Sequence, residues 1–556
     1  MNNTCATCGN SFEVNAADRA FYEKISPVVG GKTLPVPPPT RCPDCRQQRR
    51  LAWRNEHTFY RSTCKNCGRA IVSILNPGGP YSAFCHECWF SDSWDAKEYG
   101  RDINFSRPFF EQMREMNLQV PQLALSIWNS ENSNYCNYVG DVKNSYLIFG
   151  SVYSQDCYYG SPYYSTHCVD TLVVRTCERC YECIDCRELY ECSWCQDCHG
   201  SSQLLFCYDL QGCTDCIGCA GLRRKKHCIF NKQLSPEDYA MKAASLNISD
   251  PIISKLLRSR LAALKETVPH RFMQSAKAEN VSGNFVYECR NVHDAYYADR
   301  SEDCRYAAQV VDLKDCHDIN FTEEDELCYE YLGAYQNSRT AFSLFCNRLS
   351  EALYCNACHR SQNIFGCAGL RSASYCILNK QYTKDAYEKL VPKLVAHMQE
   401  TGEWGEFFPI ADSPFGYNET VASEYFPLPK AAVERHGWKW CDDLPHTTGK
   451  ETVQWKDLPA SSIEASDTIT QEVLACTACQ RNFRLIPQEL AFYRSMKLPI
   501  PQRCFDCRHL SRIAQRNPRK LWNRQCVKCA ETIATSYQPS RPEIVYCERC
   551  YLNEMY

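Results

Sequence analysis

The central part of the chain carries a short, regular alternation of small and polar residues instead of a long helical stripe. Each interval places a small or sulfur-containing residue beside Tyr, Asn, Asp or Ser, with few helix formers. The interval is 11 or 12 residues, as in Cys157, Cys168 and Cys180, and again in Cys304, Cys316 and Cys328. Short segments that cannot close a core alone are stabilised by stacking. The pattern therefore predicts a parallel β-solenoid with cysteine ladders in its interior.

This solenoid pattern occurs twice. Residues 132–240 and 279–388 align almost without gaps. The segment IGCAGLRRKKHCIFNKQ of the first repeat matches FGCAGLRSASYCILNKQ of the second, and Cys-Tyr-Glu at Cys180 matches Cys-Tyr-Glu at Cys328. We therefore expect two homologous solenoid-like repeats in tandem.

Helical patterns follow each repeat. Ser235-Pro236-Glu237-Asp238 and Thr383-Lys384-Asp385 are typical of helix starts, with a capping hydroxyl and acids in the first turn. A further helix is predicted to begin at Asp250-Pro251, with an apolar stripe formed by Ile253, Leu256, Leu257, Leu261 and Leu264. Because an uncovered solenoid end exposes strand edges, we expect this helix to cover the solenoid end or its neighbour.

The two ends of the chain are also copies of one module, each with four CxxC pairs. Only the first gap between pairs differs, by nine residues; the second and third gaps are 19 and 18 residues in both copies. Phe21 and Tyr22 match Phe492 and Tyr493 in the same register. The paired cysteines are Cys5, Cys8, Cys42, Cys45, Cys64, Cys67, Cys85 and Cys88, and Cys476, Cys479, Cys504, Cys507, Cys526, Cys529, Cys547 and Cys550.

The fold class predicted is mainly β with small α parts, in which two zinc-ribbon-like modules flank the tandem-repeat solenoid. Its length of 556 residues is too great for one core. The predicted segments are an N-terminal module (1–95), a helical and aromatic connector (96–131), repeat 1 (132–240), a helical connector (241–278), repeat 2 (279–400), an aromatic and proline-rich segment (401–445), a linker (446–466) and a C-terminal module (467–556).

Composition points to reduced thiols. The chain has 41 cysteines, and the start MNNTCATCGNSF does not read as a secretory leader. No apolar run approaches a membrane span, so we expect a cytoplasmic protein without membrane contact. The net charge of −3 does not suit the surface as a whole to nucleic acid, although local patches can still do so.

Two CxxC knuckles supply the four thiolates of a tetrahedral zinc site. Four pairs in each module therefore predict two sites per module and about four zinc ions per chain, with further ions conceivable in the repeats. Successive pairing of the knuckles is favoured over interleaved pairing, because the variable gap would then lie within one site. Iron at the same thiolates, disulfides and free thiols are the alternatives.

The terminal motifs also resemble a known family. CATCGNSFEVNAADRAFYEK followed by PPTRCPDCRQQRR, and CTACQRNFRLIPQELAFYRS followed by PIPQRCFDCRHLSR, are similar to the bacterial "probable zinc-ribbon domain" family over about 45 residues at each end. The first copy departs from the family pattern at Asp18 and Arg19, which are not ligands. The whole layout resembles cysteine-rich proteins of Candidate Phyla Radiation (Patescibacteria) bacteria. The resemblance implies zinc binding and no established activity.

The first repeat carries extra cysteines in C-x2-C-x2-C runs. Such spacing is also found in iron–sulfur ligation, but the ending C-x3-C-P of ferredoxins is absent. Packing inside the solenoid, an additional zinc ion and an iron–sulfur cluster are the interpretations left open. The cysteines concerned are Cys177, Cys180, Cys183, Cys186, Cys192, Cys195, Cys198, Cys213, Cys216 and Cys219.

A basic, potentially helical run follows the second CxxC pair of each module. Arginine with nearby aromatic residues suits phosphate contact and base stacking. The alternatives are that these arginines cover acidic parts of the protein itself or lie solvated on a helix. The candidate nucleic-acid-binding residues are Arg46, Arg49, Arg50, Arg54, Arg508, Arg512, Arg516, Arg519 and Lys520.

No P-loop, GxGxxG, HExxH or GxSxG motif occurs, so the sequence supports no catalytic residue and no small-molecule substrate. The leading hypothesis is a non-catalytic zinc-binding scaffold whose duplicated modules engage RNA or DNA. The alternatives are an assembly scaffold for a protein partner and an iron–sulfur or redox protein.

Overall fold

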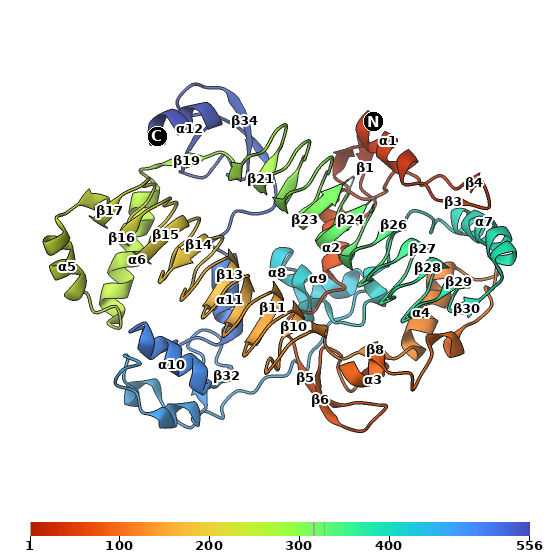
Figure 1. Ribbon diagram of the computed structural model, residues 1–556, viewed down its shortest axis with the longest axis horizontal. Helices are drawn as coiled ribbons and strands as arrows, with labels where there is room; N and C mark the ends of the chain where they lie inside the picture. Colours follow the sequence, from red (N-terminus) through yellow and green to blue (C-terminus); the bar gives the residue numbers. More distant parts are fainter. Residues whose placement is uncertain (1, 315–316, 327) are drawn as a thin grey trace. The chain divides into compact units, whose positions relative to one another are not determined.

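The computed structural model describes residues 2–314, 317–326 and 328–556, and it divides into two compact units (Figure 1). Unit 1 comprises Met1–Leu125, Met273–Leu444 and Arg519–Leu521, and unit 2 comprises Ser126–Phe272, Pro445–Pro518 and Trp522–Tyr556. The N-terminal module therefore packs with the second repeat, and the C-terminal module packs with the first. Each module is separated along the chain from the repeat in its own unit.

The first repeat is a parallel β-solenoid in unit 2, as the sequence predicts. Its rungs pair in chain order, and only the last short strand runs antiparallel (Figure 1). The strands are β9 (Ile127–Trp128), β10 (Asn137–Gly140), β11 (Tyr146–Val152), β12 (Tyr158–Tyr163), β13 (Val169–Arg175), β14 (Arg187–Tyr190), β15 (His199–Leu205), β16 (Thr214–Ile217), β17 (Lys226–Ile229) and β18 (Lys232–Gln233).

The second repeat forms the same kind of solenoid in unit 1. Its rungs also pair in parallel, and its last strand again runs antiparallel. Cys316, expected in its cysteine ladder, lies outside the described residues. The strands are β20 (Ser275–Ala276), β21 (Gly283–Tyr287), β22 (Ala295–Asp299), β23 (Ala308–Lys314), β24 (Asn320–Glu326), β25 (Leu332–Tyr335), β26 (Ser338–Ala341), β27 (Ser350–Leu353), β28 (Gln362–Phe365), β29 (Ser374–Ile377) and β30 (Lys380–Gln381).

One coil of the solenoid takes twelve residues in most rungs. Thr214 pairs with Lys226 and Cys216 pairs with Cys228, each twelve positions on. At β12 and β13 the register shifts, so that Tyr158 pairs with Val169 only eleven positions on. This shift accounts for the interval of 11 or 12 in the sequence.

Within a coil, every third residue faces inward. Cys177, Cys180, Cys183 and Cys186 are at most 2% exposed, and each follows a residue in the left-handed region, with φ of 51° to 54°. The left-handed residue turns the chain, so that a twelve-residue coil contributes four interior side chains. The C-x2-C runs are therefore the solenoid's own three-residue period, with a cysteine at each interior position.

Two glycines allow neighbouring coils to approach closely. Gly160 has φ of +138°, and a Cβ there would lie 1.9 Å from the carbonyl oxygen of Thr171. Gly283 has φ of +137°, and its Cβ would lie 1.8 Å from the carbonyl oxygen of Ala295. No side chain fits at either position without a backbone shift.

The helices after each repeat begin at the capping residues expected. Ser235 accepts a hydrogen bond from the Asp238 N–H to start α5 (Pro236–Ala244), and Thr383 accepts one from the Ala386 N–H to start α7 (Lys384–Glu400). The buried rings of Tyr239 in α5 and Tyr387 in α7 lie against the last rungs, where they contact His227 and Tyr375. These two helices thus cover the last coil of each solenoid.

Helix α6 (Pro251–Lys265) occupies a different place from the one expected. Its Leu257 is buried, and its Arg258 guanidinium carbon lies 5.4 Å from the Trp194 ring and 5.1 Å from the Phe206 ring. Both rings belong to the side of the first solenoid and stack on each other, 4.5 Å apart. The helix therefore packs along the side of its solenoid and not across its end.

The terminal modules are built from short hairpins and helices. The N-terminal module contains β1 (Asn2–Thr4), β2 (Ser11–Glu13), α1 (Ala16–Lys24), β3 (Val28–Val29), β4 (Lys32–Thr33), α2 (Pro43–Leu51), β5 (Tyr60–Thr63), β6 (Ala70–Ser73), β7 (Ala83–Phe84) and α3 (His86–Phe90). The C-terminal module contains β31 (Leu474–Ala475), β32 (Asn482–Phe483), α10 (Pro487–Ser495), α11 (Phe505–Ile513), β33 (Trp522–Gln525), β34 (Thr532–Thr535), β35 (Ile544–Tyr546) and α12 (Glu548–Met555).

The remaining segments pack onto their own units. In unit 1, β8 (Gln122–Leu123), α8 (Val421–Tyr425) and α9 (Lys430–Arg435) pack on the N-terminal module, and α4 (Phe109–Gln119) packs on the second solenoid, where the Phe109 ring contacts Tyr354 and Phe365. In unit 2, β19 (Pro269–Arg271) pairs with β35. The segment 446–466, expected as a linker, lies on the C-terminal module, where the Trp455 indole donates to the Ala475 carbonyl. Among the residues that the structure describes, no helix combines the length and the apolar character needed to cross a membrane.

Candidate metal centres

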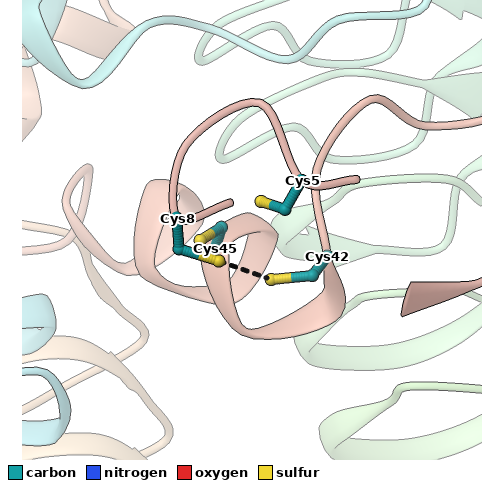
Figure 2. Close-up of side chains that lie close together, drawn as sticks. All are labelled: Cys5, Cys8, Cys42 and Cys45. Atoms are coloured by element: carbon teal, nitrogen blue, oxygen red, sulfur yellow. Dashed lines mark hydrogen bonds between the residues drawn. The ribbon is translucent and has the colours of Figure 1, made fainter. Parts of the chain in front are cut away.

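The first cluster forms where a hairpin turn meets the start of a helix. Cys5 and Cys8 lie in the turn between β1 and β2, and Cys42 and Cys45 lie at the first turn of α2 (Figure 2). Gly9, with φ of +72°, donates its N–H to the Cys5 carbonyl and closes the turn. The four sulfur atoms all lie within 4.8 Å of one another.

The same arrangement occurs four times among the described residues. The first pair of each cluster lies in a turn closed by a left-handed residue, and the first cysteine of the second pair caps a helix. The clusters are Cys5, Cys8, Cys42 and Cys45; Cys64, Cys67, Cys85 and Cys88; Cys476, Cys479, Cys504 and Cys507; and Cys526, Cys529, Cys547 and Cys550. The knuckles thus pair successively, as the sequence favours.

The spacing of the sulfur atoms fits a tetrahedral metal site. A tetrahedron with metal–sulfur bonds of about 2.3 Å has edges of about 3.8 Å. The sulfur–sulfur distance between the two knuckles is 3.7 Å from Cys8 to Cys42 and 3.9 Å from Cys67 to Cys85. In the C-terminal module the equivalent distances are 3.6 Å and 3.7 Å. Each cluster therefore has the donor set and the size to hold a metal ion.

Backbone amides lower the pKa of one thiol in each of three clusters. Burial alone would raise the pKa of Cys64, but the N–H groups of Cys67 and Cys85 donate to its sulfur and lower the pKa to about 6. The same balance of burial and amide donors lowers the pKa of Cys476 and of Cys526 to about 6. A thiolate, the form that binds metal, is thus favoured at neutral pH at one cysteine of each of these three clusters, while burial raises the pKa of its neighbours Cys85, Cys504 and Cys547.

The cysteines inside the first solenoid have a different environment. The Cys183 thiol donates to the carbonyls of Tyr181 and Cys192, with sulfur–oxygen distances of 3.5 and 3.6 Å. Burial raises the pKa of Cys186 and of Cys195 well above the usual value, whereas at Cys183 hydrogen bonds from neighbouring cysteines outweigh burial and lower the pKa well below it. Within the described part of the chain, none of these cysteines belongs to a group of three or more convergent metal-ligating side chains.

The second solenoid shows that sulfur is replaceable at these interior positions. Thr340, Ser343 and Ile364 stand where the first solenoid has Cys192, Cys195 and Cys216, and all three are buried. A ligand set would not tolerate an isoleucine or a hydroxyl in place of a thiolate. Of the interpretations left open for Cys177, Cys180, Cys183, Cys186, Cys192, Cys195, Cys198, Cys213, Cys216 and Cys219, the structure favours packing inside the solenoid.

The arginines of α2 are buried against the second solenoid. The Arg46 Nε lies 2.5 Å from Asp318 Oδ2, and the Arg49 Nη2 lies 2.5 Å from Glu330 Oε1. Arg50 also faces Asp318, with 3.6 Å between Nη2 and Oδ1. The side chains of Arg46 and Arg50 are 1% and 0% exposed. These guanidinium groups hold the N-terminal module on the solenoid.

The arginines of α11 make the matching contacts in unit 2. Arg508 Nε lies 3.0 Å from Asp170 Oδ2, and Arg512 Nη1 lies 3.0 Å from Asp170 Oδ1 and 3.2 Å from Glu182 Oε1. Both guanidinium groups are buried, with side chains 6% and 0% exposed. The duplicated module therefore uses the same positions of its helix to hold the duplicated repeat.

The other basic residues are also not an open phosphate-binding surface. Arg54 and Arg516 pair with carboxylates, and their side chains are 2% and 4% exposed. Arg519 stacks with its guanidinium carbon 4.2 Å from the Tyr425 ring, and only Lys520 is exposed. These contacts match the alternative in which the arginines neutralise acids of the protein itself.

The carboxylates that receive the arginines are the functional residues that sequence reasoning missed. Asp170, Glu182, Asp318 and Glu330 all stand at left-handed positions of the coil, with φ between 47° and 67°, and are directed at the module. Glu182 and Glu330 end the Cys-Tyr-Glu motif that both repeats share. An acid repeated at the same step of both repeats was the available indication.

Fold and site together define a β-solenoid protein with four tetracysteine clusters among its described residues. No protein-family model and no curated protein matches the chain. Among solved structures, it is similar to a protein from Desulfovibrio desulfuricans G20 described as an acetyltransferase, with 8% identity over 50% of this chain and 81% of the other, and a TM-score of 0.10. A likeness at this level carries no argument about fold or activity.

Proposed function

We propose that this protein is a non-catalytic scaffold in which four zinc ions fold the terminal modules, and the modules in turn brace two solenoids. The observation that carries the proposal is the convergence of four cysteine sulfurs at each of four places, at the spacing that a tetrahedral ion requires. Each cluster joins a hairpin to the start of a helix. Metal binding at such a site contributes directly to folding.

Zinc suits these sites better than iron. Four thiolates complete the coordination of the ion and leave no open position for a substrate, as in structural zinc sites. A single iron ion accepts the same ligands, so the metal must be measured. Elemental analysis of reduced, untagged protein should find about four zinc ions per chain. A comparable amount of iron, with visible absorption, would contradict the proposal.

We propose a protein partner in preference to a nucleic acid. The arginines that suggested phosphate contact are committed to Asp170, Asp318 and neighbouring carboxylates. A cation that is already paired and desolvated adds little to the attraction of a polyanion. The bivalent arrangement of two homologous units would strengthen binding to a partner that presents two copies of one surface.

Two binding experiments separate these partners. Fluorescence anisotropy with labelled RNA and DNA at low salt should show no binding that weakens steeply as salt rises. Affinity purification from cells, followed by mass spectrometry, should return a defined protein complex. Salt-sensitive nucleic-acid binding without such a complex would overturn this part of the proposal.

A further inference from the structure

Two arginines at matching positions of the helix dock each module on its solenoid, and a third matching arginine follows the helix. The helical arginines, Arg46 and Arg50 in α2 and Arg508 and Arg512 in α11, meet an aspartate and a glutamate at matching solenoid positions. The third arginine is Arg54 in unit 1 and Arg516 in unit 2, which match in the duplicated register. The two third arginines differ in the source of their counter-charge.

In unit 1 the counter-charge comes from the module. Arg54 Nε lies 2.6 Å from Glu56 Oε1, and both side chains are buried. The solenoid offers Gly333 at this position, where φ is +66° and a Cβ would lie 3.0 Å from the Phe345 ring, which must shift slightly, and 4.0 Å from Arg54 Nη1. An acid at residue 333 would therefore reach the guanidinium of Arg54.

In unit 2 the counter-charge comes from the solenoid. Arg516 Nε lies 3.1 Å from Asp185 Oδ2, with side chains 4% and 1% exposed. Asp185 matches Gly333 in the repeat register and is also left-handed, with φ of 54°. The module has Pro518 where the other module has Glu56. Among the described contacts, Glu56 of the module faces Arg54 and Asp185 of the solenoid faces Arg516, so the two acids come from opposite sides of the contact.

We propose that this third position is a pairing code that sorts the two homologous modules onto their proper solenoids. The N-terminal module on the first solenoid would bring Glu56 and Asp185 to one arginine. The C-terminal module on the second solenoid would bury Arg516 opposite Gly333, with neither acid present. Both mismatches are costly, because buried like charges repel and a buried charge without its partner is not solvated.

Chain order makes such a code necessary. After the connector that carries α4 and β8, the first solenoid, which begins at β9, is the next repeat along the chain, yet the N-terminal module docks on the second solenoid. The shorter connection gives the adjacent solenoid the higher effective concentration. Without a penalty on the adjacent pair, connectivity would favour the wrong docking.

A second charge difference points the same way. Arg49 in α2 bridges Glu330 and Glu406 of unit 1, whereas its counterpart in α11 is Ser511. Exchanging the modules would therefore remove one cation beside Glu330.

The first test is a double-mutant cycle in the metal-replete full chain. Glu56→Gln should lower the midpoint of denaturant unfolding, and so should Gly333→Asp alone, which adds a second acid. In the Glu56→Gln background, Gly333→Asp should instead raise the midpoint toward that of the wild type. The matched control is Gly31→Asp, at a left-handed glycine of the same unit with no atom within 4 Å of its Cβ, which should not rescue Glu56→Gln.

The decisive observation is that Gly333→Asp lowers the midpoint of unfolding in the wild-type background and raises it in the Glu56→Gln background. A Gly333→Asp effect of the same sign in both backgrounds would overturn the code, as would failure of the double variant to fold where Glu56→Gln alone does not. In unit 2, Asp185→Asn should lower the midpoint and Pro518→Glu should recover it. No recovery there would also count against the proposal.

The second test asks whether the third position determines which solenoid each module docks on, in addition to balancing the charge of the arginine. Glu56→Gln combined with Pro518→Glu exchanges the code between modules. Cross-linking mass spectrometry should then show lysines of residues 1–95 moving their links from residues 277–400 to residues 126–265. Adding Gly333→Asp and Asp185→Asn should restore the original links. Unchanged links in the exchanged variant would show that connectivity or shape alone sorts the modules.

Discussion

The two solenoids fill the same interior with different chemistry. The interior cluster of the first is dominated by cysteine, at positions such as Cys180, Cys183 and Cys195, while the second uses Thr340 and Ser343 at matching steps and keeps cysteine at others. Both repeats nevertheless keep the left-handed residue before each interior position and the coil of twelve. The comparison shows that the coil depends on backbone geometry and compact fillers, and that sulfur is one filler among several.

The terminal modules show the opposite behaviour. All eight cysteine positions are the same in the two copies, although Arg49 of the first module is replaced by Ser511 in the second, and Glu56 by Pro518. A ligand has one acceptable chemistry, whereas a filler has several. Cysteines that are kept in both copies are interpreted as metal ligands, and cysteines that are replaced between copies are interpreted as packing residues. The following predictions test this distinction.

Metal removal should have the largest effect. Chelation of reduced protein should unfold both modules, because structural zinc contributes about 10–16 kcal/mol per site in small zinc-binding peptides, at least as much as a domain's whole stability. Far-UV circular dichroism should lose helical signal, and amide exchange should accelerate in α2 and α11 alike. Retention of the full fold after chelation would refute metal-dependent folding.

Ligand substitutions resolve this effect by site. Cys42→Ser and Cys504→Ser should each reduce the zinc content from about four ions to about three. Cys441→Ser is the control: this half-buried cysteine lies outside the four clusters and bonds to Tyr60. If Cys441→Ser reduced the zinc content equally, the assignment of ligands would be wrong.

The docking acids should come next. Asp170→Asn and Asp318→Asn each leave two buried arginines short of a carboxylate, at a cost of about 3–5 kcal/mol in unfolding free energy. Glu191→Gln is the matched surface control, since its pair with Arg179 is about 30% exposed, and it should cost at most about 1 kcal/mol. Equal, small effects at all three would mean that the ion pairs do not hold the modules.

Much of this architecture could be predicted from sequence because it is periodic. The interval of 11 or 12 residues between Cys157, Cys168 and Cys180 reports one coil directly, and the parallel solenoid is confirmed. The CxxC pairs likewise report a local geometry, a turn followed by a helix start, so the four clusters could be predicted with their membership.

The remainder depends on contacts between residues far apart in the chain. Arg46 and Asp318 are separated by 272 residues, and no local pattern in the sequence joins them. The basic run of α2 has the same composition whether it faces phosphate or a buried carboxylate. The sequence reasoning also missed that inward-facing residues recur at every third position of the coil. The C-x2-C runs have this spacing, but two-residue gaps between cysteines are equally typical of metal ligands.

Exchanging thiol and hydroxyl groups between the solenoids should have a smaller effect. Cys195 and Ser343 occupy matching positions, and each donates to the carbonyl two residues earlier, at 3.4 and 2.9 Å. Cys195→Ser can keep this hydrogen bond, so we expect a cost of about 1 kcal/mol in unfolding free energy. Ser343→Cys should cost a similar amount, because Ser343 also accepts from the Cys355 N–H.

Metal content is the sharper readout of this exchange. Cys195→Ser should leave about four zinc ions per chain, as should the same change at Cys183. The buried thiols should also resist alkylation in the native state, since Cys183 and Cys195 are 0% and 1% exposed and a reagent cannot reach them. Loss of a zinc ion from either variant would show that these cysteines are metal ligands.

The smallest effect is expected at Arg519, whose counterpart in the other module is His57. Arg519 stacks on Tyr425, with 5.7 Å from its guanidinium carbon to the Tyr297 ring as well, whereas His57 pairs with Glu424. A cation–π contact contributes about 0.5–2 kcal/mol, so Arg519→Gln should lower the unfolding free energy by about 1 kcal/mol, and Arg519→Lys by less. A cost as large as that of Asp170→Asn would show instead that this guanidinium contributes more than a cation–π contact, as the buried ion pairs of the arginines in α2 and α11 do.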